Sequence, residues 1–396
     1  MKPAGENNRS ENQKPIYRDT NLQILFSITL TAVLGVAIIT PAFPKIIQEL
    51  NISPQDVGLL ITVFTFPSVI LTFVLGILAD RFGRRKVLIP SLMLFGLAGG
   101  ACAFARDFNL LLILRFFQGI GAAPLLFLTI TIIGDLFSDG KRTTAIGYYT
   151  SILNVGMASY PAVGGALAMV GWYYPFALSV IAIPVGLLVL FSLKNPEPKK
   201  KQHLKKYLHS AWQIIKNRQA VGLFVVAIIT FIIFYGSYLT YFPLLMGNSF
   251  GASSLIIGLI MASMSLTTAF TSLQLGKLAK VYSEKNLIKT AFILYALAFV
   301  IIPFVPNLWL LLVPAMIFGI AHGINIPSRV TLLAGLAPMR HRAAIMSMNE
   351  MAVRLGQTLG PLLMGVIFGI WMMGGVFYAG AGFSIAMFLL AFIMIK

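Results

Sequence analysis

Charged side chains are scarce in this sequence, where they make up 11% of 396 residues. Acidic residues are the scarcest, with 12 Asp and Glu against 30 Lys and Arg. The single cysteine, Cys102, excludes an intrachain disulfide and a zinc site built on cysteines. The sequence also lacks a glycine-lysine phosphate loop and a paired-histidine site. We therefore expect neither an enzyme nor a protein with a metal or another cofactor.

Apolar side chains are abundant: 58% of the residues are hydrophobic and the mean hydropathy is +0.87. Uncharged stretches of about 20 residues, enough to cross a bilayer, recur along the chain. They are too long for barrel strands and lack strict alternation, so helices are expected. The predicted fold class is an all-α membrane protein with twelve transmembrane helices. The predicted spans are 22–44, 55–79, 87–105, 110–136, 143–169, 173–193, 219–246, 254–279, 288–305, 308–334, 344–371 and 375–395.

The net charge of +18 follows the predicted topology rather than forming one basic face. Basic residues cluster before the first span and after every second span, whereas the opposite loops offer little beyond Lys45 and Arg106. By the positive-inside rule, this pattern predicts a multi-pass protein of the cell (inner) membrane with both termini in the cytoplasm. The expected partner of the surface is the lipid bilayer, and a nucleic acid is not expected.

The second half of the sequence repeats the first at a constant offset of 200 residues. Gly76, Gly119, Gly156 and Pro161 fall on Gly276, Gly319, Gly356 and Pro361. Six spans per half with the same loop orientation predict parallel repeats with a central site, which is the plan of a monomeric transporter of small molecules. The predicted organisation is an N-terminal tail (1–21), a six-helix bundle (22–194), a basic linker (195–218) and a second six-helix bundle (219–396).

A glycine and charge motif follows the second predicted span. It runs from Gly76 through Asp80, Arg81, Gly83, Arg84 and Arg85 to Leu88. Small residues allow close helix packing, and a buried carboxylate there needs a partner. The segment resembles the signature loop of the major facilitator superfamily. The resemblance implies a cytoplasmic latch in which Asp80 lies near the start of the eleventh helix and Asp135 pairs with an arginine. The alternative is a purely structural turn.

Two further segments resemble motifs of the drug:proton antiporter branch. Arg115, amid apolar neighbours of the fourth span, matches an arginine that influences a protonatable group, although it could serve structural pairing alone. The fifth span carries Gly156, Pro161, Gly164 and Gly165, with Tyr160 where the family has glycine, and the eleventh carries Gly360 and Pro361. These residues would form a bendable, closely packed hinge.

The resemblance implies a secondary active exporter of a hydrophobic or amphipathic, drug-like molecule, working by proton antiport and alternating access. A lipid or glycolipid flippase on the same fold is the alternative, and a membrane enzyme or receptor without transport is a more distant one.

No acidic residue lies in the first span, so proton coupling needs another carboxylate. Glu350 is the deepest candidate, with Arg354 one turn further on, and the alternative is a structural ion pair between the two. The candidates for the substrate cavity are Tyr235, Tyr238, Met264, His322 and Gln357, although ordinary packing explains such residues equally well.

Overall fold

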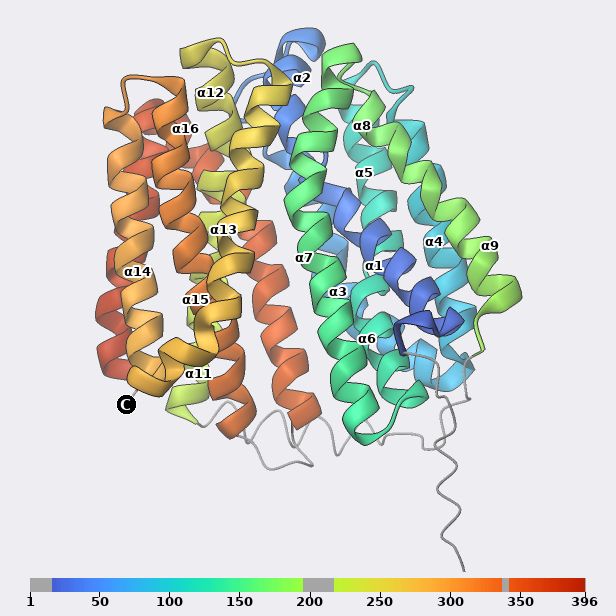
Figure 1. Cartoon of the computed structure of the whole chain (residues 1–396). Helices are drawn as coiled ribbons and strands as arrows, with labels where there is room; N and C mark the ends of the chain where they lie inside the picture. Colours follow the sequence, from blue (N-terminus) through green and yellow to red (C-terminus); the bar gives the residue numbers. More distant parts are fainter. Residues whose placement is uncertain (1–15, 195–216, 337–341, 396) are drawn as a thin grey trace, which may run out of the picture.

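The computed structural model describes residues 16–194, 217–336 and 342–395, and these ranges contain helices and no strand. Residues 1–15 and nearly all of the predicted linker lie outside the described part of the chain. In Figure 1 the helices of the first half (blue to green) stand beside those of the second half (yellow to red), all roughly along one direction. We call the end of the molecule that carries α2 and α12 the upper end, and the opposite one the lower end.

The first half begins with a short 3-10 turn and contains nine α-helices. They are α1 (Thr20–Ala37), α2 (Phe43–Leu50), α3 (Leu59–Phe82), α4 (Arg84–Cys102), α5 (Phe108–Ala122), α6 (Leu125–Leu136), α7 (Asp139–Val170), α8 (Tyr174–Ala177) and α9 (Ala182–Ser192). Short 3-10 segments, η2 (Thr40–Ala42) and η3 (Leu178–Ile181), join α1 to α2 and α8 to α9. Each pair therefore forms one longer span.

The second half has the same plan with one π-helical insert. Its elements are α11 (Arg218–Ile232), the π-helix η4 (Ile233–Tyr241), α12 (Phe242–Phe250), α13 (Ser254–Val281), α14 (Glu284–Ile301), η5 (Ile302–Phe304), η6 (Leu308–Leu311), α15 (Leu312–Leu336) and α16 (Arg342–Met394). Within this π-helix, the side-chain hydroxyl of Thr240 donates a hydrogen bond to the carbonyl of Tyr235 (2.7 Å).

Polar side chains at the ends of the loops set where several helices begin. Asp19 accepts from the backbone of Asn21 at the start of α1 (2.8 Å), and Asp107 accepts from Leu110 at the start of α5 (2.9 Å). A side-chain oxygen at this position satisfies backbone N–H groups that have no partner within the helix. The few acidic residues of the chain thus include two helix caps, which leaves still fewer for chemistry.

Ten described helices are long and apolar enough to cross a membrane, or eleven if the bent α3 is one span. The longest candidate, Ile345–Met394, would extend about 75 Å as a straight helix, more than twice the hydrocarbon thickness. Met372 breaks its backbone with φ 56° and ψ −163°, and the chain ends at the lower end of the helices (Figure 1). Counting α16 as two spans on either side of Met372 gives the predicted twelve.

The predicted spans lie on these helices, with shifts at their ends. The first span continues through α2 to Leu50 rather than ending at residue 44, and the second begins at Leu59 rather than at residue 55. Hydropathy alone cannot place such ends, because an apolar helix can continue beyond the bilayer.

The repeat of 200 residues reappears in the contacts between the two halves. Gly258 of α13 lies so close to Pro161 of α7 that a Cβ atom would come within 2.1 Å of the proline carbonyl oxygen. At the matching positions, a Cβ on Gly58 would meet Pro361 of α16 at 3.1 Å. The α7–α13 and α3–α16 contacts thus use equivalent residues, as expected for two copies of one unit related by a pseudo-twofold axis.

Hydrogen bonds also join the halves near these contacts. Thr62 of α3 donates to the carbonyl of Thr358 on α16 (3.1 Å), and the hydroxyl of Thr358 donates to that of Thr65 (3.0 Å). Ser265 of α13 donates to the carbonyl of Met157 on α7 (3.1 Å). These residues lie in the upper and middle parts of their helices, so polar contacts hold the halves together there.

Candidate functional site

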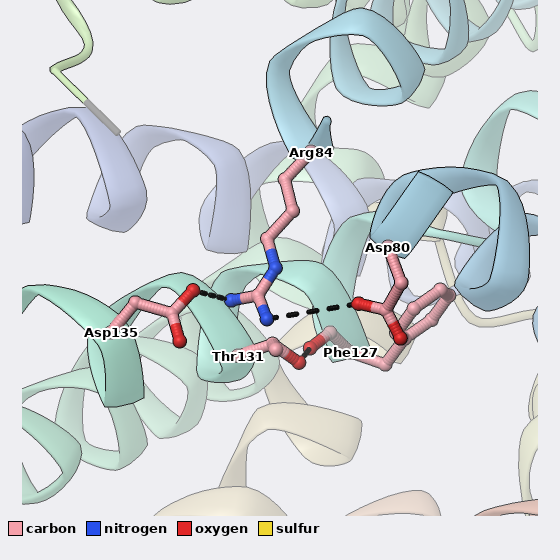
Figure 2. A network of polar contacts seen from close by, with 5 residues as sticks. All are labelled: Asp80, Arg84, Phe127, Thr131 and Asp135. Atoms are coloured by element: carbon pink, nitrogen blue, oxygen red, sulfur yellow. Dashed lines mark hydrogen bonds and ion pairs between the residues drawn. The ribbon is translucent and has the colours of Figure 1, made fainter. Parts of the chain in front are cut away.

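The motif between α3 and α4 forms an ion-pair cluster at the lower end. Arg84, whose side chain is 8% exposed, pairs with Asp135 at the end of α6, and its second nitrogen lies 3.8 Å from Asp80 (Figure 2). The arginine thus lies between two carboxylates from different helices and ties α3, α4 and α6 together. The predicted arginine partner of Asp135 is Arg84.

Glycines shape the backbone of this cluster. Gly83 has φ +100°, a conformation that costs a side-chain-bearing residue strain and lets the chain turn directly from α3 into α4. A Cβ on Gly76 of α3 would lie 3.7 Å from the ring of Phe127 on α6, which is an ordinary van der Waals contact. Around them, Arg81 stacks over Phe82 at 5.4 Å and Arg85 donates to the carbonyl of Leu190 on α9.

The expected contact of Asp80 with the start of the eleventh span is not among the contacts of the described residues. Both described ion pairs, Arg84–Asp80 and Arg84–Asp135, lie within the first half. Residues 337–341 and the side chain of Arg342, which lead into α16, lie outside the described part. The latch role of this cluster therefore stays a prediction.

Arg115 of α5 is fully buried and is held by neutral groups. It donates to the carbonyls of Gly35 on α1 (2.7 Å) and Leu60 on α3 (3.1 Å), and to Gln118 (2.7 Å). Its guanidinium also lies over the ring of Phe64 at 4.2 Å. Oriented carbonyls and an aromatic face stabilise the charge, and among the described residues no carboxylate pairs with it. Arg115 thus bridges three helices, as its alternative structural role predicts.

The glycines of the fifth and eleventh spans lie at close helix contacts. A Cβ on Gly164 would come within 1.9 Å of the Ile38 carbonyl oxygen, and one on Gly165 within 2.2 Å of the Ser254 carbonyl oxygen. A Cβ on Gly360 would lie 2.7 Å from the Ile232 carbonyl oxygen. Gly156 is also close-packed, with Leu30 at 3.3 Å. These positions fit the expected packing of a hinge, although its movement remains a prediction.

Most of the cavity candidates are packed inside the second half. Tyr238 is 1% exposed and stacks on Phe242 and Phe318, with ring centroids 5.0 and 4.9 Å away. Met264 is 2% exposed. The His322 ring lies 4.6 Å from that of Phe234. Packing, the alternative that the sequence left open, accounts for these contacts in this conformation.

Hydrogen bonds hold two of the cavity candidates, His322 and Gln357. Nδ1 of His322 shares a hydrogen bond with the hydroxyl of Tyr295 (2.9 Å). Gln357 accepts from Arg354 (3.1 Å). Tyr235 is 9% exposed, and its ring lies 6.0 Å from that of Phe231.

Glu350 and Arg354 do not form an ion pair in this structure. Arg354 bonds Gln357 instead, and the exposed carboxylate of Glu350 has no bonded partner among the described residues. Glu350 does interact electrostatically with Arg329 of α15 and with Tyr149 of α7. The charge of this carboxylate therefore acts on groups of both halves, and none of the described residues fixes its position.

Arg329 of α15 is a functional candidate that belongs to none of the sequence motifs described above. It is 2% exposed, and its Nε and Nη1 atoms have no hydrogen-bond partner among the described residues. The same stretch of α15 holds Asn325, whose amide donates to Thr230 (2.7 Å) while its oxygen is unpaired, and the buried Ser328 with an unpaired hydroxyl. The signal in the sequence is the spacing of Asn325, Ser328 and Arg329 on one apolar helix.

Comparison with known proteins shows which family the chain belongs to. The family model of the Major Facilitator Superfamily matches residues 25–248 and again 226–396, so it matches each half. Multidrug resistance protein 1 of Bacillus subtilis (strain 168) is 25% identical over 357 residues, covering 89% of this chain and 91% of the relative. Tetracycline resistance protein, class B, of Escherichia coli is 25% identical over 380 residues, covering 91% and 94%.

A crystal structure of the nucleoside transporter NupG shares the fold with a TM-score of 0.79 at 17% identity, covering 96% of this chain and 99% of that one. The family predicted from residues 76–88 is confirmed. The chain belongs to the Major Facilitator Superfamily of membrane transporters and is not an enzyme.

Proposed function

We propose that this protein is a secondary active exporter of hydrophobic or amphipathic, drug-like molecules and that it exchanges them for protons. Relatives whose names report multidrug and tetracycline resistance support the export of such compounds. The observation that carries the coupling is that Glu350 acts electrostatically on the buried Arg329, while neither group has all its hydrogen-bonding capacity used by the described residues. Lipid bilayer and protons are then the other partners of the protein.

The two groups lie at matching depth. Arg329 is seven residues before the lower end of α15 and Glu350 eight residues after the lower start of α16, which places both about 10–12 Å inside their helices. A buried polar group without a hydrogen-bond partner costs about 1–3 kcal/mol. The unbonded N–H groups of Arg329 therefore favour any state that brings an acceptor to them. Glu350 is the carboxylate whose charge acts on Arg329 in this arrangement.

This arrangement gives a coupling mechanism with two states of one carboxylate. Ionised Glu350 is attracted to Arg329, whereas a protonated Glu350 is neutral and loses most of that attraction. A cationic or polar substrate group near Glu350 would favour the ionised form and release the proton. Arg354 on α16, together with His322, Tyr295 and Tyr149 on the surrounding helices, would modulate this exchange.

We infer that the lower end faces the cytoplasm, because the predicted basic loops lie there. Thr62, Thr358 and Ser265 join the halves in the upper and middle parts of the helices. The conformation described is then closed toward the outside, and transport requires the contacts at Gly58 and Gly258 to separate as the halves rock. The ion-pair cluster at Arg84 would hold α3, α4 and α6 as one rigid unit during this movement.

The test uses purified protein in liposomes with an imposed pH gradient and amphipathic cations as substrates. Wild type and Glu350→Gln are compared, with Glu284→Gln at the start of α14 as a matched control for loss of a carboxylate near the lower end. We expect substrate-dependent proton flux in wild type and in the control, and its loss in Glu350→Gln.

Two outcomes would contradict the proposal at different points. Unchanged flux in Glu350→Gln would make this residue structural and leave antiport intact. Substrate movement in wild type without any proton flux would refute antiport and favour a facilitator or a flippase.

A further inference from the structure

Two basic residues that depart from the charge pattern of the chain meet in one cavity. Lys45 and Arg106 are the basic residues that the sequence places in loops opposite the basic ones, and 60 residues separate them in the chain. In the structure both line a cavity of about 430 Å³ at the upper end. Its lining consists of Lys45, Gln48, Glu49, Leu50, Arg106, Val170, Gly171, Trp172 and Tyr173. Two like charges in one cavity need either a ligand or a structural role to explain them.

Bonds to helix ends hold both cations in place but do not use up their donors. Nζ of Lys45 donates to the carbonyls of Ala168 and Met169 at the end of α7 (2.9 and 3.2 Å), which leaves one of its three N–H groups. Nη1 of Arg106 donates to the carbonyls of Ala103 and Ala105 at the end of α4 (2.8 and 3.0 Å). Within the described residues, the other guanidinium nitrogens of Arg106 make no hydrogen bond. Capping therefore explains where the charges lie, but not why they share a cavity.

Aromatic rings form the wall behind Arg106. Its guanidinium lies 4.7 Å from the ring centre of Tyr173 and 5.8 Å from that of Trp172. Tyrosine and tryptophan gather where a membrane protein meets the head groups of the lipids. A stacked arginine with free N–H groups at that level is suited to bidentate contact with a phosphate.

We propose that this cavity binds the head group of a phospholipid, with the phosphate between Lys45 and Arg106. Two cations against one carboxylate give the lining a net positive charge, and Glu49 can accept from an ammonium group attached to the phosphate. The chemistry therefore fits phosphatidylethanolamine better than a purely anionic lipid. With the orientation proposed above, the lipid belongs to the outer leaflet.

The surface around the cavity favours a lipid over a soluble phosphate. Beside the two cations, Val170 is 75% exposed and Phe104 is 82% exposed, and half of Met169 is exposed. Acyl chains attached to a bound head group would cover such apolar surface, whereas an inorganic ion would leave it bare. The volume is also within the range of about 300–1,000 Å³ found for small-molecule sites.

Native mass spectrometry of the full-length protein tests the site. The protein is released from nanodiscs containing equal parts of phosphatidylethanolamine and phosphatidylglycerol, and the retained lipid is counted. We expect wild type to retain phosphatidylethanolamine and Arg106→Leu to retain about tenfold less, since a charge-assisted bidentate contact is lost. Lys277→Met, which removes an exposed lysine at the lower end of α13, should behave like wild type.

A second variant keeps the test informative if Arg106→Leu disturbs the end of α4. Glu49→Gln leaves both capping cations in place, and we expect it to shift retention from phosphatidylethanolamine toward phosphatidylglycerol. Equal retention and equal lipid preference in Glu49→Gln and wild type would overturn the proposal. Displacement of the lipid by millimolar inorganic phosphate would also overturn it, since the site would then take a free anion.

Discussion

Replacing Gly258 by alanine tests whether close glycine contacts hold the upper ends of the two halves together. The added Cβ would lie 2.1 Å from the carbonyl oxygen and 2.8 Å from the carbonyl carbon of Pro161, where ordinary contacts are 3.4–4 Å. Both atoms belong to the backbone, so α13 must move away from α7 by more than an ångström. Overpacking of this kind costs about 1–3 kcal/mol. At about 1.4 kcal/mol per tenfold, the closed state would lose roughly 5- to 150-fold in population relative to states in which the upper ends are apart.

Thiol labelling at the junction measures this change. A cysteine in place of Thr62, which is 6% exposed and bonded to Thr358, reports opening of the upper end in a background where the buried Cys102 is replaced by alanine. We expect Gly258→Ala to speed labelling by at least about fivefold, the lower bound of the same estimate. Thermal unfolding in detergent should also occur at a lower temperature, because the added Cβ destabilises the closed state.

Gly276→Ala is the matched control, because it lies on the same helix and a Cβ there would meet nothing within 4 Å. It should leave labelling unchanged and stabilise α13 by up to about 1 kcal/mol through helix propensity. Gly58→Ala, with its nearest contact at 3.1 Å, should fall between the two. Equal labelling in the Gly258 and Gly276 variants would refute the role of this contact in closure.

Three further predictions concern the first half. Gly83→Ala should lower the unfolding temperature, at a cost of about 1–3 kcal/mol from φ +100° alone, since no atom lies within 4 Å of the added Cβ; an unchanged melting curve would contradict this. Asp135→Asn should destabilise by about 1–2 kcal/mol, discounted because the carboxylate is 31% exposed, and a charge-restoring Asp135→Glu should recover part of the loss in the same assay. Arg115→Met should cost about 3–5 kcal/mol, because it removes the hydrogen bonds through which a buried charge joins α5 to α1 and α3, and poor yield of folded protein in size-exclusion chromatography is the expected result.

The sequence predicts the helices and the symmetry of this fold because both depend on repeated, local signals. Hydropathy places the spans to within a few residues, and the offset of 200 residues that aligns Pro161 with Pro361 is the one that their contacts with Gly258 and Gly58 follow. The resemblance to the signature loop also implied an arginine partner for Asp135, and in the structure this partner is Arg84.

Other features depend on tertiary arrangement and had no such signal. Nothing local indicates that Lys45 and Arg106 share a cavity, because three separate segments of the chain meet to form it. Glu350 and Arg354 have ideal helical spacing for an ion pair, yet Arg354 bonds Gln357, because spacing along one helix does not reveal the competing partners.

Two buried arginines, Arg115 and Arg329, show how the halves of this transporter differ in spite of their common plan. Arg115 has carbonyl or amide acceptors for all three of its guanidinium nitrogens, so moving it would break bonds that join α5 to α1 and α3. Among the described residues, Arg329 has no acceptor for two of its nitrogens, and the charge of Glu350 acts on it. A fully bonded charge favours a single arrangement, whereas an incompletely bonded one is stabilised further by rearrangement. We therefore expect the first half to move as a rigid body and the side-chain exchange that couples protons to transport to take place in the second half.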